Sequence, residues 1–192
     1  MQQQAVSMIS EAEYIEQERT AEIKSEYYQG EIFAMAGASR KHNLIVANVI
    51  GELRYQLKNK PCRTYPSDMR LKTEATGLYT YPDVMVVCGD EKFTDERQDT
   101  LLNPDVIIEV LSDSTESYDR GRKFQNYRKV GSLKEYVMIS QHCRKIERFH
   151  KNEKQQWVLT ESDKENPSVF LESIGCELEL SEIYDKTEDI SS

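Results

Sequence analysis

Two short apolar segments, each carrying one carboxylate, constrain this chain more than any other feature. Residues 81–87 read Tyr-Pro-Asp-Val-Met-Val-Val, and residues 106–111 read Val-Ile-Ile-Glu-Val-Leu. Runs of this length, rich in β-branched residues, are typical of buried strands. A carboxylate that leaves water costs several kcal/mol unless it is paired, hydrogen-bonded or bound to a cation. Asp83 and Glu109 are therefore candidate ligands of a divalent metal ion.

Length and composition indicate one domain with a full hydrophobic core, since the chain has 192 residues. No apolar run approaches the roughly 20 residues of a membrane helix, and the N-terminus lacks the basic-then-apolar layout of a secretory signal. We therefore expect a cytoplasmic protein with no membrane partner.

The cysteines at positions 62, 88, 143 and 176 form no CxxC pair. In a cytoplasmic protein we expect them to be reduced, buried thiols rather than disulfides. A zinc site at His142 and Cys143 is disfavoured, because adjacent residues rarely bind the same ion.

The charge of the chain is unevenly distributed. The net charge of −9 argues against a nucleic-acid partner, yet residues 120–154 contain eleven Lys or Arg residues and only three acids. This segment is either a surface stretch that happens to be basic or a face directed at a polyanion. The second interpretation gains weight because the segment follows Glu109 directly.

The first half of the chain predicts a helix, a hairpin and a second helix. We expect a short lead-in helix within residues 1–24 and a hairpin that turns at Gln29–Gly30. Apolar residues at three- and four-residue steps predict an amphipathic helix over about 40–58, with Ser39 as its N-cap. A β-rich stretch follows over 62–88.

The second half predicts mainly strands. An acidic loop over 90–99, expected to be solvated and mobile, precedes a strand within 101–111. Ser112 and Ser114 are expected to cap a helix that runs to about Val130. The remaining pattern predicts short strands at 135–140, 146–150, 156–160, 168–171 and 177–180, followed by a short helix in the tail.

The predicted helix after Glu109 carries Asp119, Lys123 and Tyr127 at a spacing of four, which places them on one helix face. If this face packs over the Glu109 strand, Lys123 could hold a water molecule or neutralise charge on a phosphate. Spacing alone favours the simpler reading, an Asp119–Lys123 ion pair on the helix surface.

The order of four motifs resembles that of a known family. The motifs are Tyr-Pro-Asp-Val-x-Val-Val, Ile-Glu-Val-Leu-Ser-x-Ser-Thr, Asp-Arg-Gly-x-Lys-Phe-x-x-Tyr and Leu-Lys-Glu-Tyr-Val. Together with Tyr27-Tyr28-x-Gly30-Glu31 and Ser39-x-x-His42 upstream, they resemble the Uma-type restriction endonuclease family. That family is widespread in cyanobacteria and belongs to the PD-(D/E)XK nuclease superfamily.

This resemblance, which spans roughly residues 26–180, implies a fold and an activity. The implied fold class is α/β, with a restriction-endonuclease-like mixed β-sheet flanked by helices in a single domain over 25–180. Residues 1–24 would form the lead-in helix and residues 181–192 a C-terminal tail. The implied activity is hydrolysis of DNA phosphodiester bonds with Mg²⁺ or Mn²⁺ as the cofactor.

The resemblance also assigns site residues. Asp83 matches the motif aspartate and Glu109 the acid of the next strand, and with the main-chain carbonyl of Val110 they would hold the metal. The superfamily lysine, expected two residues after the glutamate, would fall at Leu111. The family pattern implies that Lys123, from the following helix, takes its place.

Several further assignments follow with alternatives left open. Glu31 is either an additional metal or water ligand or an exposed hairpin glutamate. His42 contacts either a phosphate or carboxylate at the site or a local polar group. The cations expected to contact DNA are Arg120, Arg122, Arg128 and Lys129.

Two questions about the whole molecule also remain at this point. A homodimer would suit an enzyme that cuts both strands. The alternative to an enzyme is a catalytically inactive nuclease-fold module that binds nucleic acid or a protein partner. A third reading, of lower weight, makes the acids and the lysine a structural salt-bridge network.

Overall fold

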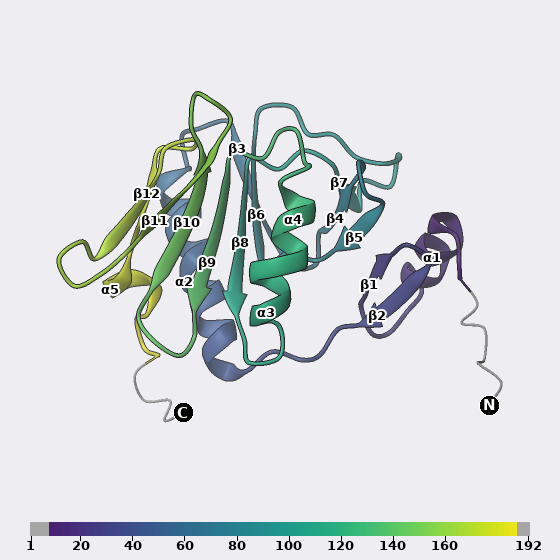
Figure 1. The fold of residues 1–192 in the computed structure, drawn as a ribbon, viewed down its shortest axis with the longest axis horizontal. Helices are drawn as coiled ribbons and strands as arrows, with labels where there is room; N and C mark the ends of the chain where they lie inside the picture. The colour runs from purple at the N-terminus through teal and green to yellow at the C-terminus, as the bar shows by residue number, and fades with distance from the viewer. Residues whose placement is uncertain (1–7, 188–192) are drawn as a thin grey trace.

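A mixed six-stranded sheet lies at the centre of the computed structural model, which describes residues 8–187 (Figure 1). Its strand order is β11-β10-β9-β8-β6-β3, with β8 and β9 parallel and the other neighbours antiparallel. The bounds of its strands are β3 (Cys62–Pro66), β6 (Val84–Cys88), β8 (Val106–Leu111), β9 (Glu135–Ser140), β10 (Ile146–Lys151) and β11 (Trp157–Glu161).

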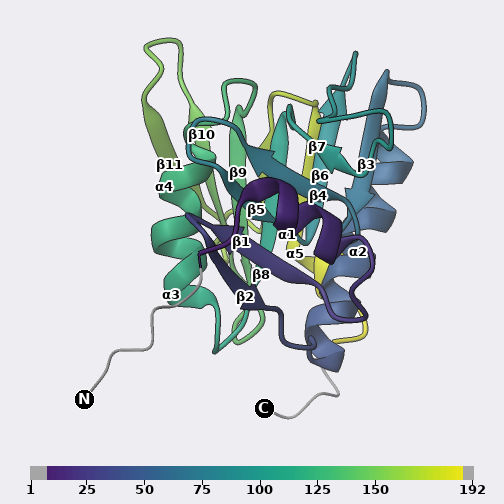
Figure 2. The same ribbon diagram turned by 90° about the vertical axis from the view of Figure 1, so that its right-hand side faces the viewer.

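A smaller five-stranded sheet packs beside the central one, in the order β2-β1-β5-β4-β7. It lies at the right of Figure 1 and faces the viewer in Figure 2. Its strands are β1 (Ser25–Tyr28), β2 (Glu31–Ala34), β4 (Arg70–Thr73), β5 (Leu78–Thr80) and β7 (Thr100–Leu101). A third, two-stranded sheet pairs β12 (Ser168–Leu171) with β13 (Cys176–Glu179).

The central strands β6 and β8 are mainly apolar because both of their faces are buried. Alternate residues such as Ile108 and Val110 face a core formed with α2 (Arg40–Gln56), β12, β13 and α5 (Leu180–Ile183). Their neighbours, such as Ile107 and Leu111, face a second core formed with the smaller sheet and the helical segment after β8. Glu109 belongs by its alternation to this second face. A carboxylate thus interrupts an otherwise apolar layer.

The N-terminal part of the fold follows the sequence-based predictions. The lead-in helix is α1 (Glu11–Glu18), and it packs against β1 and β5 through stacked tyrosines 14, 27 and 79. The hairpin turns at Gln29 and Gly30, whose φ angles of 49° and 89° lie in the left-handed region that glycine tolerates best. Ser39 caps α2 by accepting a hydrogen bond from the amide of His42 at 3.0 Å.

The short strands predicted in the second half all occur, with ends shifted by at most one or two residues. Residues 1–7 of the predicted lead-in segment and 188–192 of the predicted tail lie outside the described residues.

The acidic loop over 90–99 is held in place more firmly than we expected from its composition. The Arg19 guanidinium, just after α1, donates to Asp95 at 2.6 Å and to Asp99 at 2.7 Å. Arg70 adds an ion pair to Asp99 at 3.3 Å. Most of the loop is exposed, as expected, but Asp95 and Asp99 are paired with arginines that lie far away in the sequence.

The helix after β8 differs from its prediction in start and in shape. It consists of α3 (Glu116–Tyr118), a π-helical turn η1 (Asp119–Lys123) and α4 (Phe124–Tyr127). Neither Ser112 nor Ser114 caps it, since its N-cap is Thr115 and no side chain provides the cap hydrogen bond. Ser112 instead contacts the hydroxyls of Ser114 and Thr115. π-helical turns are rare and occur frequently at functional sites.

The expectation that all cysteines are reduced is wrong for one pair. β3 and β6 are antiparallel with Cys62 directly opposite Cys88, and the two form a disulfide. Cys143 and Cys176 are free, the first exposed and the second buried. The sequence did not reveal the pair because 26 residues separate two cysteines that only the strand register brings together.

Reduction of this disulfide is expected to destabilise the fold. Opening a loop of this length should lower the free energy of unfolding by about 3 kcal/mol. Urea denaturation with and without dithiothreitol measures the difference, and a Cys62→Ala/Cys88→Ala double variant serves as the control that reductant should not affect. Equal stability of the reduced and oxidised wild type would contradict the expectation.

Within the described part of the chain, no helix is long and apolar enough to cross a membrane.

Candidate active site

The register of β6 against β8 brings the two predicted carboxylates together. Val84 pairs with Ile108, so Asp83 and Glu109 are opposite one another at the end of the antiparallel pair. The Asp83 amide donates to Glu109 Oε2 at 3.4 Å, and the Val110 amide donates to Asp83 Oδ2 at 2.7 Å. The adjacency of the two acids is thus built into the backbone pairing of the central sheet.

Lys123 reaches this pair of acids from η1. Its Nζ lies 3.2 Å from Glu109 Oε1 and 3.1 Å from Asp119 Oδ1. A third carboxylate, from Glu26 on β1, lies 3.3 Å from the same nitrogen. The Lys123 side chain is only 7 % exposed. The three residues whose convergence the hydrolytic hypothesis requires do lie in one environment.

Tyr127 completes the contacts of Glu109. Its hydroxyl donates to Glu109 Oε1 at 2.9 Å and lies 3.0 Å from the hydroxyl of Thr80. Burial, and next the charge of Glu109, raise the pKa of Tyr127 well above its usual value, so the phenol keeps its proton and remains a donor. The predicted common face of Asp119, Lys123 and Tyr127 is therefore directed at Glu109.

His42 is the residue that links α2 to the site. Its Nε2 lies 3.0 Å from Asp83 Oδ1, and its side chain is 13 % exposed. Of the two alternatives for this histidine, the structure supports the contact with a carboxylate of the site. The Ser39 cap at the start of α2 fixes the turn from which His42 reaches Asp83.

The cluster contains more negative than positive groups. Three carboxylates, those of Glu26, Glu109 and Asp119, lie within 3.3 Å of the Lys123 ammonium, and Asp83 lies next to Glu109. Burial raises the pKa of Glu109 well above its usual 4.5, and the neighbouring acids add to this despite the opposing effect of Lys123. Burial alone would lower the pKa of Lys123, but Glu109 and its neighbours outweigh it, and the pKa lies well above 10.5. Lys123 is therefore an ammonium at neutral pH.

The donor set fits a hard cation that keeps most of its water. Within residues 8–187, no group of three or more His, Cys, Asp or Glu side chains is arranged to hold a metal ion. Mg²⁺ commonly binds through one or two carboxylates, with water and substrate phosphate completing its shell. Asp83 and Glu109 match that requirement. The β8 strand that contains Val110 is paired along its whole length with β9, which orders the backbone carbonyl predicted as a ligand.

Glu26 is the site residue that sequence reasoning missed, and Glu31 is the hairpin glutamate that was considered instead. Glu26 is 7 % exposed, whereas Glu31 is exposed and makes no side-chain contact within the described residues. Strand alternation could have distinguished Glu26, because it is the acid between two residues, Ser25 and Tyr27, in a strand buried on both faces.

The predicted DNA-contacting cations differ in their surroundings. Arg120 is engaged in ion pairs with Glu116 at 2.7 Å and Glu147 at 2.5 Å. Arg122 and Arg128 are exposed and stack on aromatic rings, whereas Lys129 is exposed without a side-chain partner within the described residues. Arg120 is thus the least available of the four.

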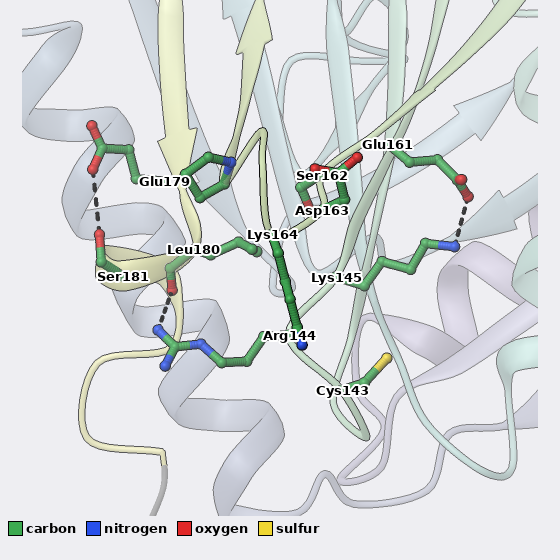
Figure 3. A pocket seen from close by; sticks show the side chains of 11 residues that line it. Cys143, Arg144, Lys145, Glu161, Ser162, Asp163, Lys164, Glu179, Leu180 and Ser181 are labelled. Atoms are coloured by element: carbon green, nitrogen blue, oxygen red, sulfur yellow. Dashed lines mark hydrogen bonds and ion pairs between the residues drawn. The ribbon is translucent and has the colours of Figure 1, made fainter.

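A surface cavity lies away from the acid cluster. Its volume is about 880 Å³, and it opens between the β9–β10 turn, the β11–β12 loop and α5 (Figure 3). Its lining charges are largely engaged with the protein itself, as Lys145 is with Glu161 at 2.6 Å. Leu180 in its wall belongs to the core on the α2 side of the central sheet, whereas Glu109 belongs to the opposite face. The cavity is therefore separate from the candidate site.

Comparisons with known proteins agree with this architecture. Residues 11–181 match the sequence profile of the family Uma2, described as "Putative restriction endonuclease". Two relatives from Synechocystis sp. are "Uncharacterized protein sll1609", 40 % identical over 84 % of this chain and 92 % of the relative, and "Uncharacterized protein slr1290", 33 % identical over 92 % of this chain and 91 % of the relative.

The fold also matches a solved structure. A crystal structure of a "putative nuclease belonging to DUF820" from Anabaena variabilis superposes with a TM-score of 0.77 over 93 % of this chain and 99 % of that chain, at 18 % sequence identity. The fold is therefore the predicted restriction-endonuclease-like α/β fold, in a single domain. With a family profile covering most of its length and two relatives above 30 % identity, the chain belongs to the Uma2 family.

Proposed function

We propose that this protein is a metal-dependent endonuclease that hydrolyses DNA phosphodiester bonds, with Mg²⁺ or Mn²⁺ held by Asp83 and Glu109. The observation that supports the proposal most directly is the adjacency of these carboxylates to the Lys123 ammonium, which lies 3.2 Å from Glu109. Membership of a restriction endonuclease family supports the reaction class. A bound divalent cation would supply an acidified water and offset the charge that develops on the phosphate oxygens.

Lys123 would act as a fixed positive charge rather than as a base. Because its pKa is raised, it holds its protons at neutral pH and cannot abstract one from water. An ammonium in a site with little water interacts strongly with a phosphate oxygen that gains charge. The role that fits is stabilisation of the scissile phosphate, with Asp119 and Glu26 holding the amine in position.

The other polar residues would orient the acids. The Tyr127 hydroxyl and the Lys123 ammonium both contact Glu109 Oε1. Oε2 accepts only the long 3.4 Å hydrogen bond from the Asp83 amide within the described residues, so it is the oxygen that would bind a cation. The Val110 amide fixes Asp83 Oδ2, so Oδ1, which faces His42, is the corresponding oxygen of the aspartate. Groups fixed in this way lose little freedom when a ligand binds.

The proposal is tested by incubating wild-type protein with supercoiled plasmid and with oligonucleotide substrates. Nicking or cleavage is expected with Mg²⁺ or Mn²⁺ and should stop with EDTA. Gel electrophoresis of the DNA measures it. Binding without cleavage across metals and substrates would contradict the enzyme and support the second candidate below.

The second candidate is a nuclease-fold module that binds nucleic acid or a protein partner without cutting. The observation that favours it is the degree to which the acids are engaged with the protein, since Lys123 is in contact with three carboxylates. Fold does not dictate activity, so the cleavage assay decides between the two.

A further inference from the structure

The acid cluster is largely buried. The side chains of Glu109 and Asp119 are 4 % and 2 % exposed, and Asp83 is the most accessible of the predicted ligands at 17 %. A DNA duplex is a stiff rod with a persistence length of about 50 nm, so its phosphates cannot leave the helical path without deformation. A flexible single strand meets no such restriction. The burial of these acids therefore favours an unpaired strand at this site.

The β1–β2 hairpin carries aromatic residues close to the cluster, because β1 also contains Glu26. Glu26, which contacts Lys123, pairs directly with Phe33 across the hairpin. Side chains of directly opposed residues lie on the same face of an antiparallel pair, so Phe33 shares the face of Glu26. Tyr28, two residues after Glu26, lies on that face as well. The ring of Phe33 is 42 % exposed, and Tyr28 is partly exposed.

Cations lie in two segments that also supply residues of the cluster. The guanidinium carbon of Arg122, next to Lys123 in η1, is 5.7 Å from the centroid of the Tyr28 ring. Arg40 and Lys41 stand in the first turn of α2, in the same turn as His42. Neither makes a side-chain ion pair or hydrogen bond within the described residues, so both are free to contact a phosphate.

We propose that this entrance, formed by Tyr28, Phe33, Arg40, Lys41 and Arg122, binds an unpaired nucleic-acid strand in preference to an intact duplex. Bases stack on the aromatic rings of the hairpin, and the cations contact the phosphates on either side of the acids. Sequence-tolerant binding of single strands combines these two elements, because every base has a face that can stack. The inference rests on the proposed function only for the reason why a strand is bound. The binding itself does not require that the protein cleaves DNA.

The test is the affinity of the full-length protein for a fluorescein-labelled 20-nucleotide strand and for the same sequence as a duplex. Fluorescence anisotropy in EDTA keeps both DNAs intact, so the result does not depend on whether the protein cleaves them. We expect at least about 10-fold tighter binding of the single strand, as flexible strands gain stacking contacts that a duplex cannot offer. Equal or tighter binding of the duplex would overturn the proposal.

Two variants locate the binding surface. Phe33→Ser should weaken single-strand binding by about 5- to 150-fold, the range for the loss of one base–aromatic stack. Arg122→Gln should reduce the slope of log affinity against log salt by about 1. The matched control is Phe170→Ser, which removes an equally exposed phenylalanine (51 %) from β12 and should leave binding unchanged.

An exposed phenylalanine on the edge strand β2 could instead be a contact between two copies of the chain. Light scattering on wild type and Phe33→Ser distinguishes this. A change from dimer to monomer, with no loss of single-strand affinity, would overturn the proposal. An unchanged molecular mass together with the expected loss of affinity would support it.

Discussion

Replacing Lys123 by methionine is expected to lower the free energy of unfolding by about 3–5 kcal/mol, the cost of removing one partner from a buried ion pair. The lysine is the ammonium that offsets the carboxylates of Glu26, Glu109 and Asp119, all within 3.3 Å of it. Methionine fills a similar volume, so the loss of stability comes from the missing charge rather than from altered packing. Urea denaturation in EDTA measures it.

The matched control for this experiment is Lys129→Met, which removes an exposed lysine six positions further along the same segment. Because Lys129 has no side-chain partner within the described residues, its replacement should change stability by less than about 0.5 kcal/mol. Adding Glu26→Gln to Lys123→Met should recover part of the lost stability by removing one uncompensated acid. If Lys123→Met is as stable as Lys129→Met, the buried ion-pair cluster does not exist in solution.

Replacing Asp83 by asparagine or Glu109 by glutamine is expected to change activity and stability in opposite directions. Mutation of a residue that only hydrogen-bonds a metal ligand commonly lowers metal affinity or activity by about 10- to 100-fold. Loss of a direct ligand should therefore reduce Mg²⁺-dependent cleavage by at least about 100-fold. The same change removes one of several mutually repelling acids, and the metal-free protein should become more stable. Plasmid nicking and thermal unfolding measure the two effects.

The gain in stability of Glu109→Gln should depend on pH. In the folded protein the pKa of Glu109 is raised by burial, so the native state holds this proton more tightly than the unfolded chain does. Below pH 4.5 Glu109 is protonated in both states, so it does not lower the stability of the wild type. As pH rises above 4.5 the unfolded chain releases the proton first, and the wild type loses stability until the raised native pKa is passed. The advantage of the variant in EDTA should therefore be larger at pH 8 than at pH 4.5.

The control for these variants is Asp68→Asn, which alters an exposed aspartate whose side chain, among residues 8–187, forms an ion pair only with Lys24. It should neither stabilise the protein nor reduce cleavage. An Asp83→Asn protein that cleaves as well as wild type would remove this aspartate from the catalytic hypothesis.

The parts of the fold that depend on residues close together in the chain could be predicted from the sequence. The hairpin at Gln29–Gly30, the Ser39 cap and the amphipathic periodicity of α2 each depend on residues close together in the chain. The buried strands β6, which begins just after Asp83, and β8, which contains Glu109, were recognisable for the same reason. The distance between Asp83 and Glu109 could not be read from the sequence, because it depends on the antiparallel register of β6 and β8.

The features that the sequence did not reveal all depend on long-range pairing. Cys62 and Cys88 meet only through the register of β3 and β6, and Arg19 reaches Asp95 across 76 positions. Glu26 was overlooked because nothing near it in the sequence indicates that Lys123 lies above its strand. The π-helical turn was also not predictable, since periodicity does not separate an α-helix from one that widens for five residues.

The role proposed for Lys123 has a consequence for how related proteins are recognised. Glu109 and Lys123 are 14 positions apart, yet their side chains touch, because the crossover from β8 to β9 folds the segment back over the strand that precedes it. A text search that demands glutamate and lysine two letters apart would discard this chain at Leu111. Such a search should instead compare the position of the lysine amine in three dimensions. A lysine at more than one place in the sequence can bring its amine to the same position.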